Sequence, residues 1–190
     1  MCYSSFEDTT MLNDSFSGDG FIVRQSQITD VKYGRYPSAK NGCGWIAAYN
    51  LLKLAGRNPD PRAVAKSLEK TLLFGGYLGT SLAPLAIYLA AKGLRPSLRF
   101  TWWSTEAGSK KFSSGILLCR AKKYAHYVAY SNNGGEFKFY NSEFDCKTMR
   151  EFFAALKPWL CISINLKNKG CGYEKLEKKA AQPGDRKQEV

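Results

Sequence analysis

The spacing of apolar residues along the chain predicts helices in the first half and strands in the second. From Cys43, apolar residues recur every three or four positions until Gly56, which predicts a buried helix that begins at the cysteine. The same spacing predicts helices over residues 61–71 and 81–92, and a short strand is expected at residues 21–23. The first half is therefore expected to be mainly helical.

Beyond residue 96 the pattern changes to short runs rich in β-branched and aromatic residues, which are typical of strands. A helix is expected to separate the last two of these strands, at Lys147–Leu156. Helices followed by strands predict an α+β fold with an antiparallel sheet. The five expected strands are Ser97–Trp103, Gly115–Arg120, Tyr124–Ser131, Glu136–Tyr140 and Trp159–Leu166.

The length of 190 residues and a hydrophobic content of 44% predict one globular domain with a core of its own. We expect residues 1–20 to form a flexible polar lead-in, residues 21–166 the domain, and residues 167–190 a charged tail. No apolar run is long enough to span a membrane, and the N-terminus lacks the features of a secretory signal. The expected location is the cytoplasm, or outside the cell by a route without a recognisable N-terminal signal.

The chain carries a net charge of +12, and its basic residues lie mainly between residues 31 and 166. Such a charge favours an acidic peptide or protein, a nucleic acid or an anionic membrane surface as partner. The basic residues are scattered singly or in pairs, without a nucleic-acid-binding motif. The preferred interpretation of the charge is therefore a solvated, lysine-rich surface, with a peptide or protein substrate, one that can be acidic, as the expected partner and nucleic acid as the least favoured one.

The cysteines and the single histidine limit the chemistry that the chain can perform. No two of the six cysteines are two or three positions apart, so neither a metal knuckle nor a disulfide framework is predicted. One histidine, His126, is too few for the usual zinc sites, and no metal or cofactor is expected. Cys119 and Cys161 lie in apolar runs and are expected in the core. Any cysteine–histidine pair must use His126.

Cys43 stands between Gly42 and Gly44 at the expected start of a helix. The partial positive charge of a helix N-terminus favours a thiolate there, and a thiolate is a nucleophile. The two glycines are expected to let a substrate carbonyl approach the sulfur closely. The alternative is a small buried cysteine that merely fills the start of a helix.

His126 lies on a predicted hairpin strand, and the turn decides which residue faces it. If Asn133-Gly134 form the turn, His126 pairs with Asn141; if Gly134-Gly135 form it, the partner is Glu143. Cross-strand neighbours are about 5 Å apart at Cβ, so either side chain can orient the imidazole. We prefer the register that selects Asn141. The alternative is that His126 has no chemical role and is only a half-buried residue of a strand.

The order of a helix-start cysteine, a strand histidine and a strand-end asparagine resembles that of papain-like cysteine peptidases. The stretches Asn41–Gly44, His126–Tyr130 and Phe139–Ser142 are most similar to the bacterial peptidases that trim double-glycine leaders from bacteriocin precursors, and to their stand-alone relatives. The resemblance covers about residues 30–166. It implies a helical half that carries the cysteine, packed on a twisted antiparallel sheet that carries the histidine, with a cleft between them and a Cys43–His126–Asn141 triad.

The chain departs from that family at the oxyanion site. The family has a glutamine five or six residues before the cysteine, where this chain has Ser38 and Pro37. Asn41, or Lys40, is expected to replace it, together with the backbone N–H of Cys43. Losing one such donor costs about 10²- to 10³-fold in rate.

Five residues are expected to bind substrate: Gly42, Gly44, Trp45, Gly76 and Tyr77. Residues 75–79 and 104–114 are expected to form walls of the cleft, and for Trp45 a place in the core is the first expectation. Besides hydrolysis, the same residues are compatible with acyl transfer to an amine. The missing glutamine favours a third interpretation, a catalytically silent binding module with a papain-like scaffold.

Overall fold

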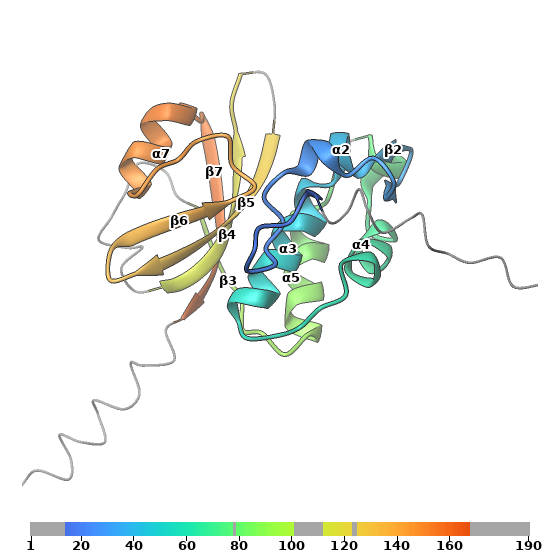
Figure 1. Ribbon diagram of the computed structural model, residues 1–190, viewed down its shortest axis with the longest axis horizontal. Helices are drawn as coiled ribbons and strands as arrows, with labels where there is room; N and C mark the ends of the chain where they lie inside the picture. The colour runs from blue at the N-terminus through green and yellow to red at the C-terminus, as the bar shows by residue number, and fades with distance from the viewer. Residues whose placement is uncertain (1–13, 78, 101–111, 123–124, 168–190) are drawn as a thin grey trace, which may run out of the picture.

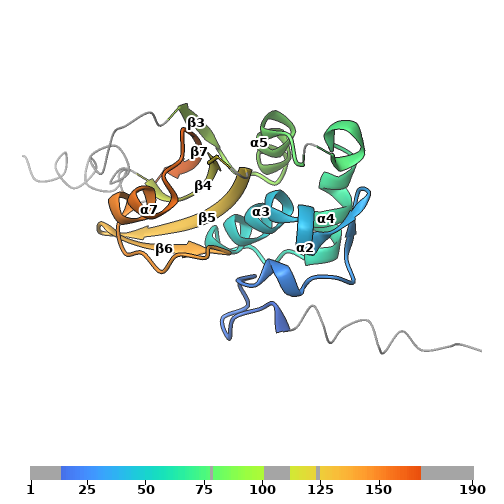
Figure 2. The same cartoon turned by 90° about the horizontal axis from the view of Figure 1, so that it is seen from above.

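The computed structural model describes residues 14–77, 79–100, 112–122 and 125–167. A sheet separates α7 from the other helices, which lie together against its opposite face (Figures 1 and 2). In chain order the elements are η1 (Gln25–Gln27), β1 (Lys32–Tyr33), β2 (Tyr36–Pro37), α2 (Ser38–Asn41), α3 (Cys43–Leu54), α4 (Pro61–Glu69), η2 (Leu73–Gly76), α5 (Leu82–Ala91), β3 (Ser97–Phe100), β4 (Phe112–Arg120), β5 (Ala125–Asn133), β6 (Glu136–Tyr140), α7 (Met149–Leu156) and β7 (Leu160–Lys167).

The main sheet has five strands in the order β3-β7-β4-β5-β6, and every neighbouring pair is antiparallel. The α+β class expected from the sequence is confirmed. Apart from the short strand expected at 21–23, the expected strands and helices are present within two or three residues of their predicted ends where the structure describes them. The expected strand at 97–103 is described only as far as Phe100, and the expected cleft wall at 104–114 lies mostly outside the described residues.

Helix α3 lies at the centre of the helical half, and nine consecutive residues of it, from Gly44 to Leu52, are buried. A helix that is apolar on all sides is stable only when other elements surround it. Here α4 and α5 pack on one side and β4 and β5 on the other. Cys43, the first residue of α3, is thereby held against the sheet.

The two faces of the sheet bury different residues because strand side chains alternate. Ile116 on β4 and Tyr127 and Ala129 on β5 face the helical half. Their neighbours Leu117 and Val128 face α7, where they pack with Phe152. The capping box of Thr148 and Glu151 holds the first turn of α7 in place.

Residues 14–20, expected as part of a flexible lead-in, are folded against α3. The carbonyl of Ser15 accepts hydrogen bonds from the N–H groups of Val23 and Arg24, and Phe16 packs edge-on against Tyr49. Ile22 forms only an isolated bridge with Phe16, so the strand expected at 21–23 is absent. The side chain of Asn50, in α3, hydrogen-bonds both the N–H and the carbonyl of Ile22. Tertiary contacts therefore anchor this N-terminal segment.

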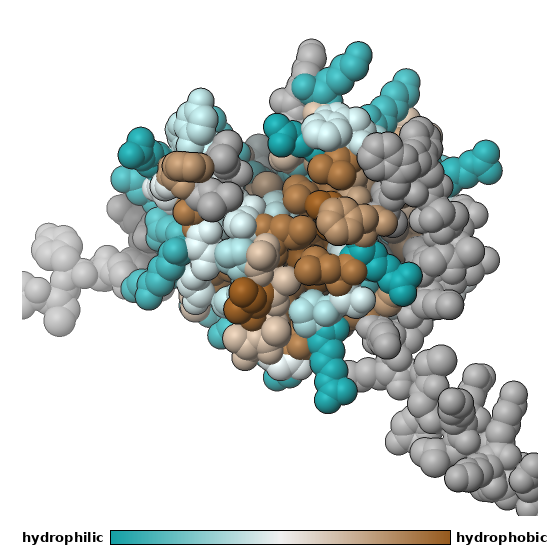
Figure 3. Space-filling model, turned by 180° about the vertical axis from the view of Figure 1, so that it is seen from behind, coloured by the Kyte–Doolittle hydropathy of each residue, from teal (hydrophilic) through white to brown (hydrophobic). Residues whose placement is uncertain are grey.

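Part of the apolar surface remains exposed on the face opposite to that of Figure 1 (Figure 3). Among the described residues, Ile87 of α5 and Phe100 of the edge strand β3 are more than half exposed, and Leu98 of β3 is half exposed. None of the helices described is long and apolar enough to cross a lipid bilayer.

Candidate functional site

Cys43 is positioned by a nearly continuous helical segment, in which α2 is followed by Gly42 and then by α3. Its side chain is half-buried and carries a free thiol. As the first residue of α3, it has a backbone N–H without an acceptor inside that helix. The predicted place of the cysteine at a helix N-terminus is confirmed.

The glycines beside Cys43 make room for protein atoms, which corrects the role expected for them. A methyl group on Gly42 would lie closer than 3.0 Å to Ser38 and to the indole nitrogen of Trp45. Trp45 is fully buried and donates its indole N–H to Ser38 Oγ at 3.0 Å. It belongs to the core, as first expected. Because these groups are occupied with one another, Gly42 and Trp45 do not form a substrate surface.

Gly44 faces Thr80, which is held from two further sides. A methyl group on Gly44 would overlap both Oγ1 and Cβ of Thr80. The hydroxyl of Tyr33 hydrogen-bonds Thr80 Oγ1 at 2.9 Å, and that of Tyr127 donates to the Thr80 carbonyl at 3.0 Å. Burial raises the pKa of both tyrosines, and the nearby Cys43 contributes to the rise. Two neutral phenols therefore line the inner side of the cysteine.

The turn between β5 and β6 uses Gly134-Gly135, so the register that we preferred is wrong and the alternative is right. Asn133 pairs with Glu136 and Ala129 with Tyr140, and both glycines have positive φ. A type I′ turn needs positive φ at both central positions, which glycine adopts without steric cost. The Asn132 side chain accepts a hydrogen bond from the N–H of Gly135 and fixes this turn.

In this register His126 has no partner in β6, because the ladder ends at Ala129–Tyr140. Asn141 follows with a φ of 60°, a left-handed conformation that turns the chain out of the strand. As a result its backbone carbonyl, and not its side chain, meets His126 Nε2 at 2.9 Å. A carbonyl can only accept, so Nε2 carries the proton and Nδ1 is the acceptor.

The side chain of Cys43 also lies near enough to His126 to influence its charge. Because Nε2 is engaged by Asn141, the contact with the thiol is assigned to Nδ1. Burial alone lowers the pKa of His126, but the interaction with Cys43, the Asn141 carbonyl and Glu143 together raise it above its ordinary value of 6.5. These surroundings therefore favour the protonated form of His126 more than water does.

The buried side chain of Asn141 is bound to Gln25, a residue that the sequence did not single out. Asn141 Oδ1 accepts from the backbone N–H of Gln25 at 3.1 Å, and its Nδ2 donates to Gln25 Oε1 at 2.9 Å. Gln25 Nε2 in turn donates to the carbonyl of Ala39, in α2, at 3.3 Å. This chain of contacts, the Gln25–Asn141 clasp, ties the segment before the cysteine to the residue that holds the histidine.

Asn41, expected to bind the oxyanion, holds the loop beside it. Its Nδ2 donates to the carbonyl of Gly76 at 2.8 Å, which leaves one amide N–H for another acceptor. Gly76 is buried, whereas Phe74 and Tyr77 next to it are 78% and 75% exposed. Tyr77 is therefore free to meet a substrate, but Gly76 is packed under Asn41.

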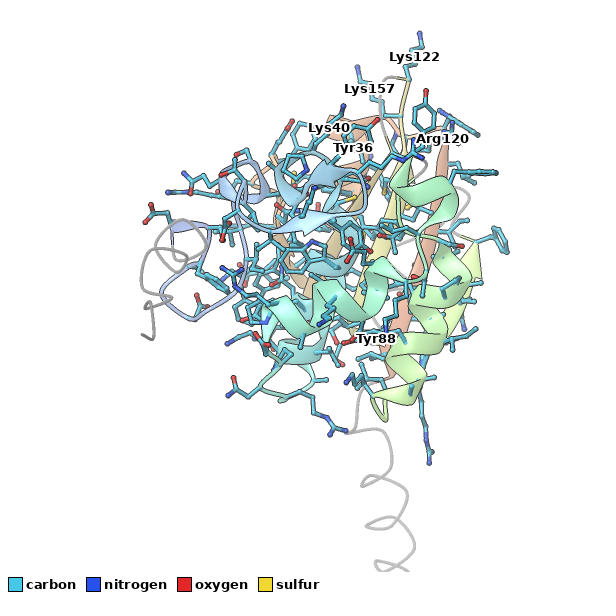
Figure 4. All side chains as sticks on the ribbon, turned by 90° about the vertical axis from the view of Figure 1, so that its right-hand side faces the viewer. Tyr36, Lys40, Tyr88, Arg120, Lys122 and Lys157 are labelled. Atoms are coloured by element: carbon cyan, nitrogen blue, oxygen red, sulfur yellow. The ribbon has the colours of Figure 1, made fainter. Side chains whose placement is uncertain are left out.

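Exposed cations gather at the end of the molecule where α3 and β5 begin (Figure 4). Lys40 lies three residues before Cys43, and its ammonium is 4.1 Å from the centre of the Tyr36 ring. Arg120 is paired across the sheet with Ala125, the residue before His126. Lys122 and Lys157 extend from the same end. A substrate that approaches this end meets a positive field.

Replacing Cys43 by alanine should lower the pKa of His126, since burial still lowers it while the contact with the sulfur is lost. A group whose pKa is raised on folding stabilises the fold below its unfolded value near 6.5, and this contribution disappears as pH rises through the folded value. The variant should therefore lose stability relative to the wild type mainly at acidic pH.

The measurement is NMR titration of the imidazole, which is unambiguous because the chain has one histidine. Cys146→Ala, at another half-buried cysteine, is the matched control and should leave the titration unchanged. An unchanged pKa in Cys43→Ala would disprove the contact.

Replacing Gln25 by alanine should cost about 1–2 kcal/mol of unfolding free energy, because the Asn141 amide loses a partner in a buried place. Urea unfolding followed by tryptophan fluorescence measures this. Gln27→Ala, at an exposed glutamine of the same short helix, should have no effect. Equal stabilities of the two variants would show that the Gln25–Asn141 clasp contributes nothing.

The described residues contain no group of three or more histidine, cysteine, aspartate or glutamate side chains that could hold a metal ion. Comparison of the sequence with protein-family models yields no match. Comparison with curated proteins yields none either.

Proposed function

We propose that this protein is a papain-like cysteine hydrolase of amide bonds, most simply a peptidase. The observation that carries the proposal is the placement of Cys43, at the start of α3, near His126, whose Nε2 is held by the Asn141 carbonyl. A nucleophile, a base and a group that orients the base are the minimal set for thiol catalysis. The helical half carries Cys43, and the antiparallel sheet carries His126.

In the reaction, His126 Nδ1 takes the thiol proton and the sulfur lone pair forms a bond to the substrate carbonyl carbon. The carbonyl π electrons move to oxygen, and their return breaks the C–N bond. The leaving amine takes its proton from His126, and a thioester on Cys43 remains. Water then gives a proton to His126, attacks the thioester, and expels the thiolate.

Two donors are assigned to the oxyanion. The backbone N–H of Cys43 has no acceptor within α3. The second donor is the remaining amide N–H of Gln25 or of Asn41, each of which already uses one N–H on a backbone carbonyl. Gln25 lies 18 positions before Cys43, yet its contact with Ala39 brings it to the end of α2. This contact supports Gln25 as a replacement for the amide that the sequence lacks near the cysteine.

The charge at this end supports a substrate with acidic residues near the cleaved bond. Lys40, Arg120, Lys122 and Lys157 are all exposed there, and the whole chain is strongly basic. The exposed ring of Tyr77 offers an apolar surface on the loop that Asn41 holds through Gly76. An extended acidic peptide fits this combination.

The test is acylation of Cys43 by N-acetylglycine p-nitrophenyl ester, with release of nitrophenol followed and the labelled peptide located by mass spectrometry. Wild type and Cys146→Ala should show an acyl group on Cys43 that water removes, and Cys43→Ala should show none. Turnover that requires an added amine would instead assign an acyltransferase. A folded wild type that never acylates at Cys43 would refute catalysis and leave the silent binding module.

A further inference from the structure

A pocket of about 120 Å³ opens next to the histidine, on the α7 side of the sheet. Three elements form it: the start of β5, the loop after β6, and α7. Its lining residues are His126, Val128, Ser142, Glu143, Phe144, Phe152 and Leu156. The pocket is therefore adjacent to the reaction centre, yet it uses none of the residues of the helical half.

The His126 ring connects this pocket to the cysteine. The same side chain interacts with Cys43 and forms part of the pocket wall. If the proposed function holds, His126 must give a proton to the leaving amine, which therefore comes within about 3 Å of the ring. The residue that carries this amine then has its side chain within reach of the pocket.

We propose that the pocket binds an apolar side chain on the residue that follows the cleaved bond, and thereby selects the leaving group. Val128 and Phe152, only 2% and 1% exposed, are buried on this side of the sheet, and Phe144 and Leu156 complete the apolar lining. An apolar cavity of about 150 Å³ holds a benzene molecule. A volume of about 120 Å³ accordingly suits a four-carbon side chain such as that of leucine.

Glu143 contributes a negative charge to the lining of the pocket. Its side chain is exposed, it belongs to the lining, and its charge contributes to the raised pKa of His126. A carboxylate at this place repels an acidic side chain and attracts an ammonium group. The leaving residue is thus apolar, while acidic residues of the substrate lie further away, among the lysines.

The experiment uses the single histidine as a reporter of occupancy, so it does not depend on catalysis. The full chain is titrated with leucinamide and with glycinamide while the His126 imidazole signal is followed by NMR. Leucinamide should reach half-saturation at a concentration about tenfold to hundredfold lower than glycinamide, the gain expected for burying a leucine side chain. Equal effects of the two amides would overturn the proposal.

Leu156→Asp, which places a charge in the pocket, should abolish the preference for leucinamide, and the milder Leu156→Gln should reduce it without risk to the fold. The matched control is Ala155→Asp, the same charge at an exposed position of α7, which should keep the preference. A preference that survives in both Leu156 variants would also overturn the proposal. Failure of Cys43 to acylate concerns the proposed function alone, whereas failure of leucinamide to act on the imidazole concerns the pocket.

Discussion

In a His126→Ala variant, alkylation of Cys43 by iodoacetamide at pH 6.5 should be about 100-fold slower than in the wild type. His126 interacts with Cys43 and, if the proposed function holds, stabilises its thiolate as an imidazolium. An ordinary thiol is about 1% ionised at this pH, so removal of the partner leaves little of the reactive form. If the proposed function holds, hydrolysis should fall by about 10²- to 10⁴-fold, because the proposed general base is lost as well.

Cys146 provides the control inside the same sample. Burial, together with Glu151 and Asp145, raises its pKa, so it should react slowly in both proteins and equally in each. Mass spectrometry of the two cysteine peptides gives both rates at once. Equal alkylation of Cys43 with and without the imidazole would refute the ion pair and, with it, the catalytic role of His126.

A Gly44→Ala variant should lose about 3 kcal/mol of stability, the upper range for an overpacked core position. The added methyl group would overlap Thr80, which cannot retreat because Tyr33 and Tyr127 hold its side chain and its carbonyl. In a domain of this size the melting temperature should fall by about 6–12 °C. Circular dichroism during heating measures the change.

Two companion variants decide whether the overlap is the cause. Gly18→Ala adds the same methyl group where nothing lies within 4 Å and φ is ordinary, so it should melt like the wild type. Thr80→Gly removes the group that the methyl meets, and should recover part of the loss when combined with Gly44→Ala. A wild-type melting temperature for Gly44→Ala would contradict this packing.

The elements of the fold were largely predictable from the sequence because they depend on residues close together in the chain. The helix from Cys43 to Leu54 followed from the spacing of its apolar residues, and Gly56, with positive φ, follows its end as expected. The Asn132–Gly135 stretch predicted the β5–β6 hairpin. The single histidine meant that any cysteine–histidine pair had to use His126.

The register of that hairpin was not predictable, because two overlapping turns satisfied the same composition. Asn133-Gly134 and Gly134-Gly135 are both good turn sequences, and they differ by two positions in the residue opposite His126. The structure selects the two glycines. The left-handed conformation of Asn141 then decides that a backbone carbonyl, and no side chain of either candidate, holds the imidazole.

What the sequence by itself determined is the class of the fold and the two candidate site residues, Cys43 and His126, which rest on periodicity, turn residues and residue type. What the tertiary structure alone decided is how those groups are supported: Gln25 bound to Asn141 across 116 positions, Thr80 packed against Gly44, and the apolar pocket beside His126. Side-chain partners far apart in the chain leave no periodic signal, because they arise only when packing brings separate elements together.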